Sequence, residues 1–278
     1  MTRGGDDERW IGAARVRLTI RPDPDTWRPC TTVTSPFVLG AGPCFELSSP
    51  HLARVFRLSA GWRVFTLDTP HLDARFERIG DDPRAIRRAF TPEVLTRLAH
   101  LPAIRIHSDG ARLELYHPYR FADASVSRLV VEVVGLLAQV DAAPALASLR
   151  ALPDVVFHEP IGNVDSYRPA TAELPALGAQ IVFLGERGRR ITRVMRPCAG
   201  RPLNGVHSID ASGRPQATSR LPAGVLARLP ALGAALLRSQ DGWATVTFDG
   251  IVTDEARLLA AAAVCRALAT AATESVYR

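Results

Sequence analysis

One polar stretch of this sequence, residues 158–167 (HEPIGNVDSY), contains side chains that could perform acid–base chemistry. An imidazole (His158), two carboxylates (Glu159 and Asp165) and a phenol (Tyr167) in one loop could exchange protons with a substrate or bind a metal weakly. Neighbouring residues of an extended segment point to opposite faces, so His158 and Glu159 are not expected to converge. A polar connection between two structural repeats explains the same residues.

The other histidines are scattered along the chain. We interpret His107 and His117 as solvated, because each lies beside a predicted turn residue. His207 lies in a region rich in Gly and Pro and could face a cleft. We therefore name four candidates for an acid–base site, and assign none of them a catalytic role from the sequence: His158, Glu159, Asp165 and His207.

The absence of lysine excludes several kinds of chemistry. All 34 basic residues are Arg, which is typical of a chain encoded by a GC-rich genome. A Walker phosphate loop, a Schiff base and conventional protein-kinase chemistry each need a lysine. The sequence also lacks GxGxxG, GxSxG and HExxH motifs. The four cysteines are far apart and lack zinc-type spacing, so we expect free thiols and neither a cofactor nor a metal.

Some residues could instead form a binding surface. Two Arg-rich segments and two strand-like segments with Trp supply the candidates, which are Arg84, Arg88, Arg187, Arg190, Trp62 and Trp243. Clustered arginines could contact phosphates, whereas Trp could anchor a protein partner. Acidic residues are interspersed with the arginines, and aromatic residues make up only 6% of the chain. That mixture favours a solvated surface over a nucleic-acid interface.

The chain has the composition of a folded protein, and we expect no secretory signal. Its net charge is +6 and its hydrophobic content is 47%. The first ten residues, MTRGGDDERW, lack an apolar core. The most apolar window, residues 258–272, is short, rich in Ala and interrupted by Arg266, so we do not expect it to span a bilayer. We expect a cytoplasmic protein.

The elements that must position these residues occur twice in the same order. Residues 92–140 and 222–272 each read as a helix that starts at Pro, two strands around Asp-Gly, an Asp cap and a long apolar helix. Such a repeat predicts two pseudo-symmetric units that arose by duplication. The second copy has smaller side chains in its last helix and lacks the helix that Asp82 would cap in the first.

Local signals predict where the elements begin. Asp82 before Pro83 is a favourable helix start, and Asp123 and Asp254 should cap the two long helices. Asp109-Gly110 suits a type I′ turn, in which both central residues have positive φ. Residues 15–20, 54–58, 62–67 and 76–79 alternate like strands. Cys265 should pack on the inner face of the last helix.

These patterns predict an α+β protein with two tandem units, each an antiparallel sheet with packed helices. We expect an N-terminal strand or arm at 1–40, a first repeat at 41–150, a connecting segment at 151–180 and a degenerate second repeat at 181–278. No motif resembles that of a characterised family. We expect a non-catalytic scaffold or protein-binding protein; the alternatives are an enzyme with an acid–base site between the repeats and an Arg-driven nucleic-acid binder.

Overall fold

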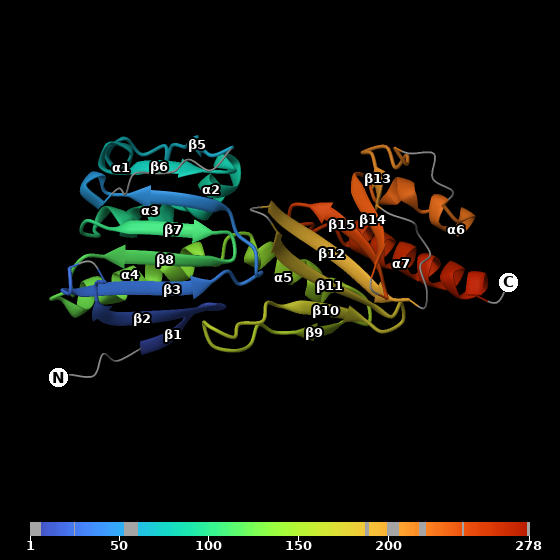
Figure 1. The fold of residues 1–278 in the computed structure, drawn as a ribbon, viewed down its shortest axis with the longest axis horizontal. Coiled ribbons are helices and arrows are strands. Elements are labelled where there is room, and N and C mark those ends of the chain that lie inside the picture. The colour runs from blue at the N-terminus through green and yellow to red at the C-terminus, as the bar shows by residue number, and fades with distance from the viewer. Residues whose placement is uncertain are drawn as a thin grey trace. The chain divides into compact units, whose positions relative to one another are not determined.

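The computed structural model describes residues 7–24, 26–52, 61–186, 189–198, 206–216, 221–240 and 242–276 (Figure 1). The chain forms two compact units. Unit 1 comprises residues 1–142, 160–168 and 185–189, and unit 2 comprises residues 143–159, 169–184 and 190–278. Each unit contains one antiparallel sheet, so the predicted α+β class is confirmed.

The sheet of unit 1 has eight strands in the order β1-β2-β3-β8-β7-β4-β6-β5. Their bounds are β1 Asp7–Ile11, β2 Ala14–Pro22, β3 Pro29–Pro36, β4 Cys44–Ser48, β5 Arg63–Val64, β6 Glu77–Gly80, β7 Arg105–Asp109 and β8 Arg112–His117. The strands predicted at 15–20 and 76–79 are therefore present. Of the strand expected at 62–67, only β5 is found. The strand expected at 54–58 lies outside the described residues.

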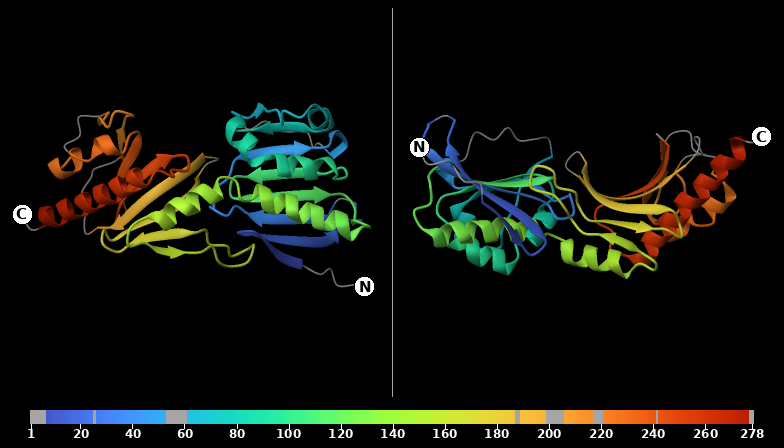
Figure 2. Two further views of the ribbon diagram at one scale, coloured as in Figure 1. Left: turned by 180° about the vertical axis from the view of Figure 1, so that it is seen from behind. Right: turned by 90° about the horizontal axis from the view of Figure 1, so that it is seen from below.

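The helices of unit 1 cover one face of its sheet. They are α1 Pro70–Arg75, α2 Pro83–Ala89, α3 Pro92–Ala99 and α4 Ala124–Leu137, with a short 3-10 turn η1 at Pro50–Leu52. Figure 2 shows α3 and α4 beneath the sheet, where α4 packs against β1, β2, β3 and β8. Alternate strand residues such as Val33, Ile106 and Leu115 are fully buried on this face. The apolar face of α4 that the sequence predicts thus forms the core of the unit.

The predicted helix caps are confirmed, but the predicted turn is wrong. The carboxylate of Asp82 accepts hydrogen bonds from the backbone N–H groups of Arg84 and Ala85, and Asp123 accepts one from Ser125. At the β7–β8 turn, Gly110 has a φ of 89°, but Asp109 is not among the residues with positive φ, so the turn is not type I′. The Asp109 carboxylate instead accepts hydrogen bonds from the N–H groups of residues 111 and 112, and this side-chain bonding fixes the turn.

The sheet of unit 2 has seven strands in the order β13-β14-β15-β12-β11-β10-β9. Their bounds are β9 Val156–His158, β10 Thr171–Leu174, β11 Ala179–Glu186, β12 Arg189–Pro197, β13 Val206–Ile209, β14 Ala235–Gln240 and β15 Trp243–Asp249. Strand β13 lies in the region rich in Gly and Pro that contains His207.

The helices of unit 2 are α5 Ala142–Ala151, α6 Ala223–Leu226 and α7 Glu255–Val276, with a 3-10 turn η2 at Leu229–Ala231. Figure 2 shows α5 and α7 on one face of the sheet. The inner residues of α7 were predicted correctly, since Leu258, Ala261, Cys265 and Leu268 are fully buried. Asp254 caps α7 by accepting a hydrogen bond from the backbone of Arg257. Duplication of an ancestral unit stays a prediction.

Two further properties concern the whole described chain. All four cysteines are free thiols, and Cys30, Cys44 and Cys265 are buried. Among the described helices, none alone is long and apolar enough to cross a membrane; α4 and α5 together pass that test by length and composition.

Candidate binding surface

The face of the unit 2 sheet opposite α5 and α7 is here called the open face. No helix lies on it among the described elements (Figure 2). Cross-strand pairs assign residues to this face: Val206 pairs with Arg238, and Trp243 pairs with Pro197. Large apolar side chains are exposed on this face, with exposed fractions of 55% for Val206, 44% for Leu236 and 37% for Trp243.

The sequence of β14 explains why apolar residues reach the open face. Strand residues alternate between faces, so only one of two adjacent Leu residues can enter the core. Leu237 is fully buried beneath the sheet, whereas Leu236 points to the other face. In a strand with one buried and one solvent-exposed face, a polar residue would be expected at position 236. The apolar residue is thus not required for packing within the described part of unit 2.

A pocket of about 260 Å³ lies on unit 2 around Trp243. It lies where β15 begins, where β12 ends at Pro197, and beside the turn that joins β10 to β11. The lining residues that bear on recognition are Glu173, Pro175, Gln180, Pro197 and Trp243. The pocket combines an indole and two proline rings with one carboxylate and one amide, which is the composition of a small recognition site.

Among the described residues, three ionisable side chains bear on the charge of this pocket. Glu173 lines it, and its carboxylate lies 3.4 Å from Nε2 of His158 on the neighbouring strand β9. Both side chains are about half exposed. Arg196 lies behind the turn, where its guanidinium donates a hydrogen bond to the carbonyl of Leu177. His158 and Trp243, both candidates from the sequence, therefore belong to the same region of unit 2.

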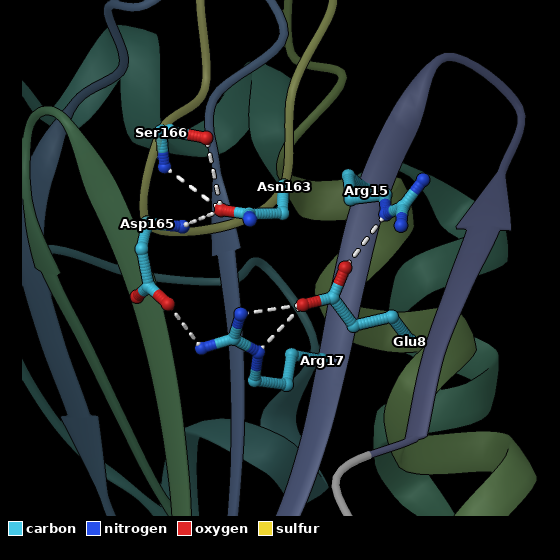
Figure 3. Close-up of polar contacts among 6 residues, drawn as sticks. All are labelled: Glu8, Arg15, Arg17, Asn163, Asp165 and Ser166. Carbon is cyan, nitrogen blue, oxygen red and sulfur yellow. Dashed lines mark hydrogen bonds and ion pairs between the residues drawn. The ribbon is translucent and has the colours of Figure 1, made fainter.

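The remaining acid–base candidates have other partners. Glu159 forms an ion pair with Arg150 at 2.7 Å. In unit 1, Asp165 lies 2.6 Å from Nη1 of Arg17. Figure 3 shows Arg17 between the carboxylates of Asp165 and Glu8, and Arg15 on the second oxygen of Glu8. This network attaches the 160–168 loop to strand β2, so Asp165 has a structural role.

Tyr167 and His207 are half-buried, and their polar atoms are directed into the protein. Burial raises the pKa of Tyr167, and its hydroxyl donates a hydrogen bond to the carbonyl of Val38 at 3.1 Å. His207 pairs with Leu237 across β13 and β14, which directs it to the inner face. Both ring nitrogens of His207 are buried and lack a hydrogen-bond partner among the described residues.

The candidate arginines do not form one described cluster. Arg84 and Arg88 are exposed on α2 in unit 1, and Arg88 forms an ion pair with Asp141 at 3.1 Å. Arg190 belongs to β12 in unit 2, and Arg187 lies outside the described residues. Trp62 is half-buried immediately before β5.

Sequence reasoning missed a charged cluster on the face of the unit 1 sheet opposite α4. Glu46, at the centre of β4, is only 5% exposed. Its carboxylate accepts a hydrogen bond from Nε of Arg105 and lies 3.6 Å from Nδ1 of His107. Burial raises the pKa of Glu46, but the nearby His107 and the hydrogen bond from Arg105 outweigh it and hold the pKa below 4.5. The one available signal was an acid within the apolar strand CFELS.

Neighbouring groups also differ from the sequence interpretation. His107 faces Glu46 instead of being merely solvated. The interpretation of His117 as solvated is wrong: it is 9% exposed, its Nδ1 lies 2.7 Å from the carbonyl of Ala103, and it stacks on Phe121. In the described part of the chain, no group of three or more His, Cys, Asp or Glu side chains could hold a metal ion.

Comparisons with known proteins give little further information. No protein-family model matches the chain, and no curated protein matches it. Among solved structures, the crystal structure of the mycobacterial trehalose monomycolate transport factor A aligns with a TM-score of 0.34 and 10% sequence identity. The alignment covers 50% of this chain and 74% of that chain. A TM-score of 0.34 is too low to assign a common fold.

Proposed function

We propose that this chain is a non-catalytic protein-binding protein, and that the open face of unit 2 is its binding surface. The observation that carries the proposal is the exposure of Val206, Leu236 and Trp243 on one sheet face beside a pocket. Exposed apolar patches with polar rims mark interaction sites, because their burial by a partner removes apolar surface from water.

The surroundings of the apolar residues fit a protein partner. Thr245 and Thr247 lie between them on β15, and Arg193 and Arg238 lie on the flanking strands. A partly apolar surface crossed by hydrogen-bonding groups is the usual composition of a non-obligate protein interface. Trp contributes a large contact area at a small cost in side-chain entropy, so Trp243 is the residue on which we expect binding to depend most.

The acid–base alternative is less well supported. Two of its four residues, Glu159 and Asp165, form ion pairs with arginines at 2.7 Å and 2.6 Å. A general base must be free to accept the proton of a substrate. The nucleic-acid alternative has the support of the net charge of +6 alone.

Site-specific photocrosslinking tests the proposal. The full chain carrying benzoylphenylalanine in place of Leu236 is expressed in its native host and irradiated, and the adducts are identified by mass spectrometry. Val64 is the matched control, because it is an exposed strand residue of unit 1. We expect a discrete protein adduct from position 236 that excess wild-type chain suppresses, and none at position 64. No adduct from 236, or the same adducts from both positions, would refute the proposal.

A further inference from the structure

We infer that the pocket around Trp243 binds an arginine side chain of the partner protein, an inference that rests on the proposed function. The lining residues are arranged in order across the sheet. Trp243 on β15 pairs with Pro197 on β12, while Gln180 on β11 pairs with Glu173 on β10. Adjacent strands are ~4.8 Å apart, and three such spacings separate β15, which carries the indole, from β10, which carries the carboxylate. The two backbones are therefore roughly 14 Å apart.

This order places an apolar surface at one end of the pocket and a charge at the other. Trp243, Pro197 and Pro175 supply rings, whereas Glu173 and Gln180 supply oxygen acceptors. Arginine has the complementary construction, since its methylene stem packs on apolar surface while its head keeps polar contacts. Its guanidinium can also donate two parallel hydrogen bonds to one carboxylate. A pocket of about 260 Å³ has room for one such side chain.

The negative charge in the pocket favours a ligand with a positive charge. Glu173 is the only ionisable residue among those that line the pocket in the described chain. Its described polar contact is with His158, at 3.4 Å, and both side chains are about half exposed. The nearby Arg196 is directed to the carbonyl of Leu177. An anionic ligand would be repelled by Glu173, and an aliphatic one would desolvate Glu173 and Gln180 without pairing them.

Arginine is favoured over lysine by the same groups. A planar guanidinium stacks on indole faces and forks onto a carboxylate, while an ammonium acts as a strongly hydrated point charge. Gln180 adds an amide oxygen beside Glu173, so more than one N–H donor can be satisfied.

A pair of blocked peptides tests the inference on the full chain. The probes are acetyl-Gly-Arg-Gly-amide and its citrulline analogue, which keeps the shape of arginine without the charge. Binding is followed by the indole N–H signals in ¹H–¹⁵N spectra, because the chain has only four Trp residues. The Trp243 signal is assigned with Trp243→Phe. We expect a saturable shift of this signal with the arginine peptide.

The variants separate a pocket effect from general charge attraction. Citrulline should bind about tenfold more weakly, the ratio expected when a charge-assisted bond becomes a neutral one. Glu173→Gln should reduce arginine binding by a similar factor, while Glu77→Gln, which removes an exposed strand carboxylate from unit 1, should leave it unchanged. Well-dispersed spectra of both variants report that they are folded.

Two results would overturn the inference: equal shifts with arginine and citrulline, or an arginine shift that survives Glu173→Gln. If either occurs while crosslinking at position 236 persists, the pocket inference fails and the protein-binding proposal stands. If the arginine shift is selective but no adduct forms at 236, the pocket inference stands and the wider binding surface is refuted.

Discussion

Replacing Arg105 by Met should destabilise unit 1 more than an ordinary surface substitution does. Arg105 donates a hydrogen bond to Glu46, whose side chain is 6% exposed while that of Arg105 is 25% exposed. The substitution keeps most of the apolar stem but removes the charge. Glu46 is then left as a buried carboxylate whose remaining charged neighbour among the described residues is His107, at 3.6 Å.

The magnitude follows from the cost of an unpaired buried charge. Removing one partner of a buried ion pair costs about 3–5 kcal/mol. Arg105 is partly exposed, so water can replace some of its contacts, and we expect the lower end of that range, about 3 kcal/mol. The double variant Glu46→Gln/Arg105→Met removes both charges and should recover at least half of the loss, because no charge remains buried.

The loss should depend on pH. The pKa of Glu46 in the folded chain lies below its value of 4.5 in the unfolded chain. Such a group contributes stability above pH 4.5, and this stability is lost as the pH falls through the folded pKa. The difference between the wild type and Arg105→Met is therefore expected to be largest near neutral pH and to shrink in acid, where Glu46 becomes neutral in both.

Urea unfolding followed by hydrogen-exchange mass spectrometry measures the effect, because peptides from β4 and β7 report on unit 1 separately. A chain with two units need not unfold in a single step, so a global signal would mix them. A loss under about 1 kcal/mol at neutral pH, in the range of an exposed pair, would refute the reasoning. So would a double variant no more stable than Arg105→Met.

Three other predictions follow from single contacts. Asp82→Ala should destabilise unit 1 by about 1 kcal/mol in urea unfolding, because it removes the α2 cap, and Asp82→Asn should retain most of the stability; equal losses would contradict this. Gly135→Ala should lower thermal stability, since a Cβ there would lie 2.5 Å from Cβ of Ile11, and the loss should be smaller in an Ile11→Ala background; an undiminished loss would exclude this contact as the cause. Burial is the main cause that raises the pKa of the Cys44 and Cys265 thiols to about 12. At pH 8 a thiol reagent should therefore modify the half-buried Cys198 before it modifies Cys44 or Cys265. Rapid labelling of Cys265 in the folded chain, seen by peptide mass spectrometry, would contradict the last prediction.

The sequence predicted those parts of the fold that depend on neighbouring residues. The caps at Asp82, Asp123 and Asp254 need a side-chain oxygen and the next turn of backbone, and all three were found. The inner face of α7 follows from the helical period alone. The Asp109-Gly110 turn was misjudged because the Asp109 side chain bonds to the backbone, an alternative to the type I′ geometry that the residue pair also allows.

The candidate site was only partly accessible from the sequence. Trp243 and His158 were named, but the pocket also needs Glu173, Gln180 and Pro197, which come from three different strands. Nothing local distinguishes Glu173 from other exposed acids. Its importance arises because the order β15-β12-β11-β10 places it across the sheet from the indole.

The residue types of this chain therefore determined which segments become strands and helices, and which faces of them avoid water. Tertiary structure alone decided which polar groups meet. Glu46 and Arg105 are 59 residues apart, and they became neighbours because β4 pairs with β7. Strand order depends on the free energy of the whole sheet and its packed helices, so no short stretch of sequence encodes it.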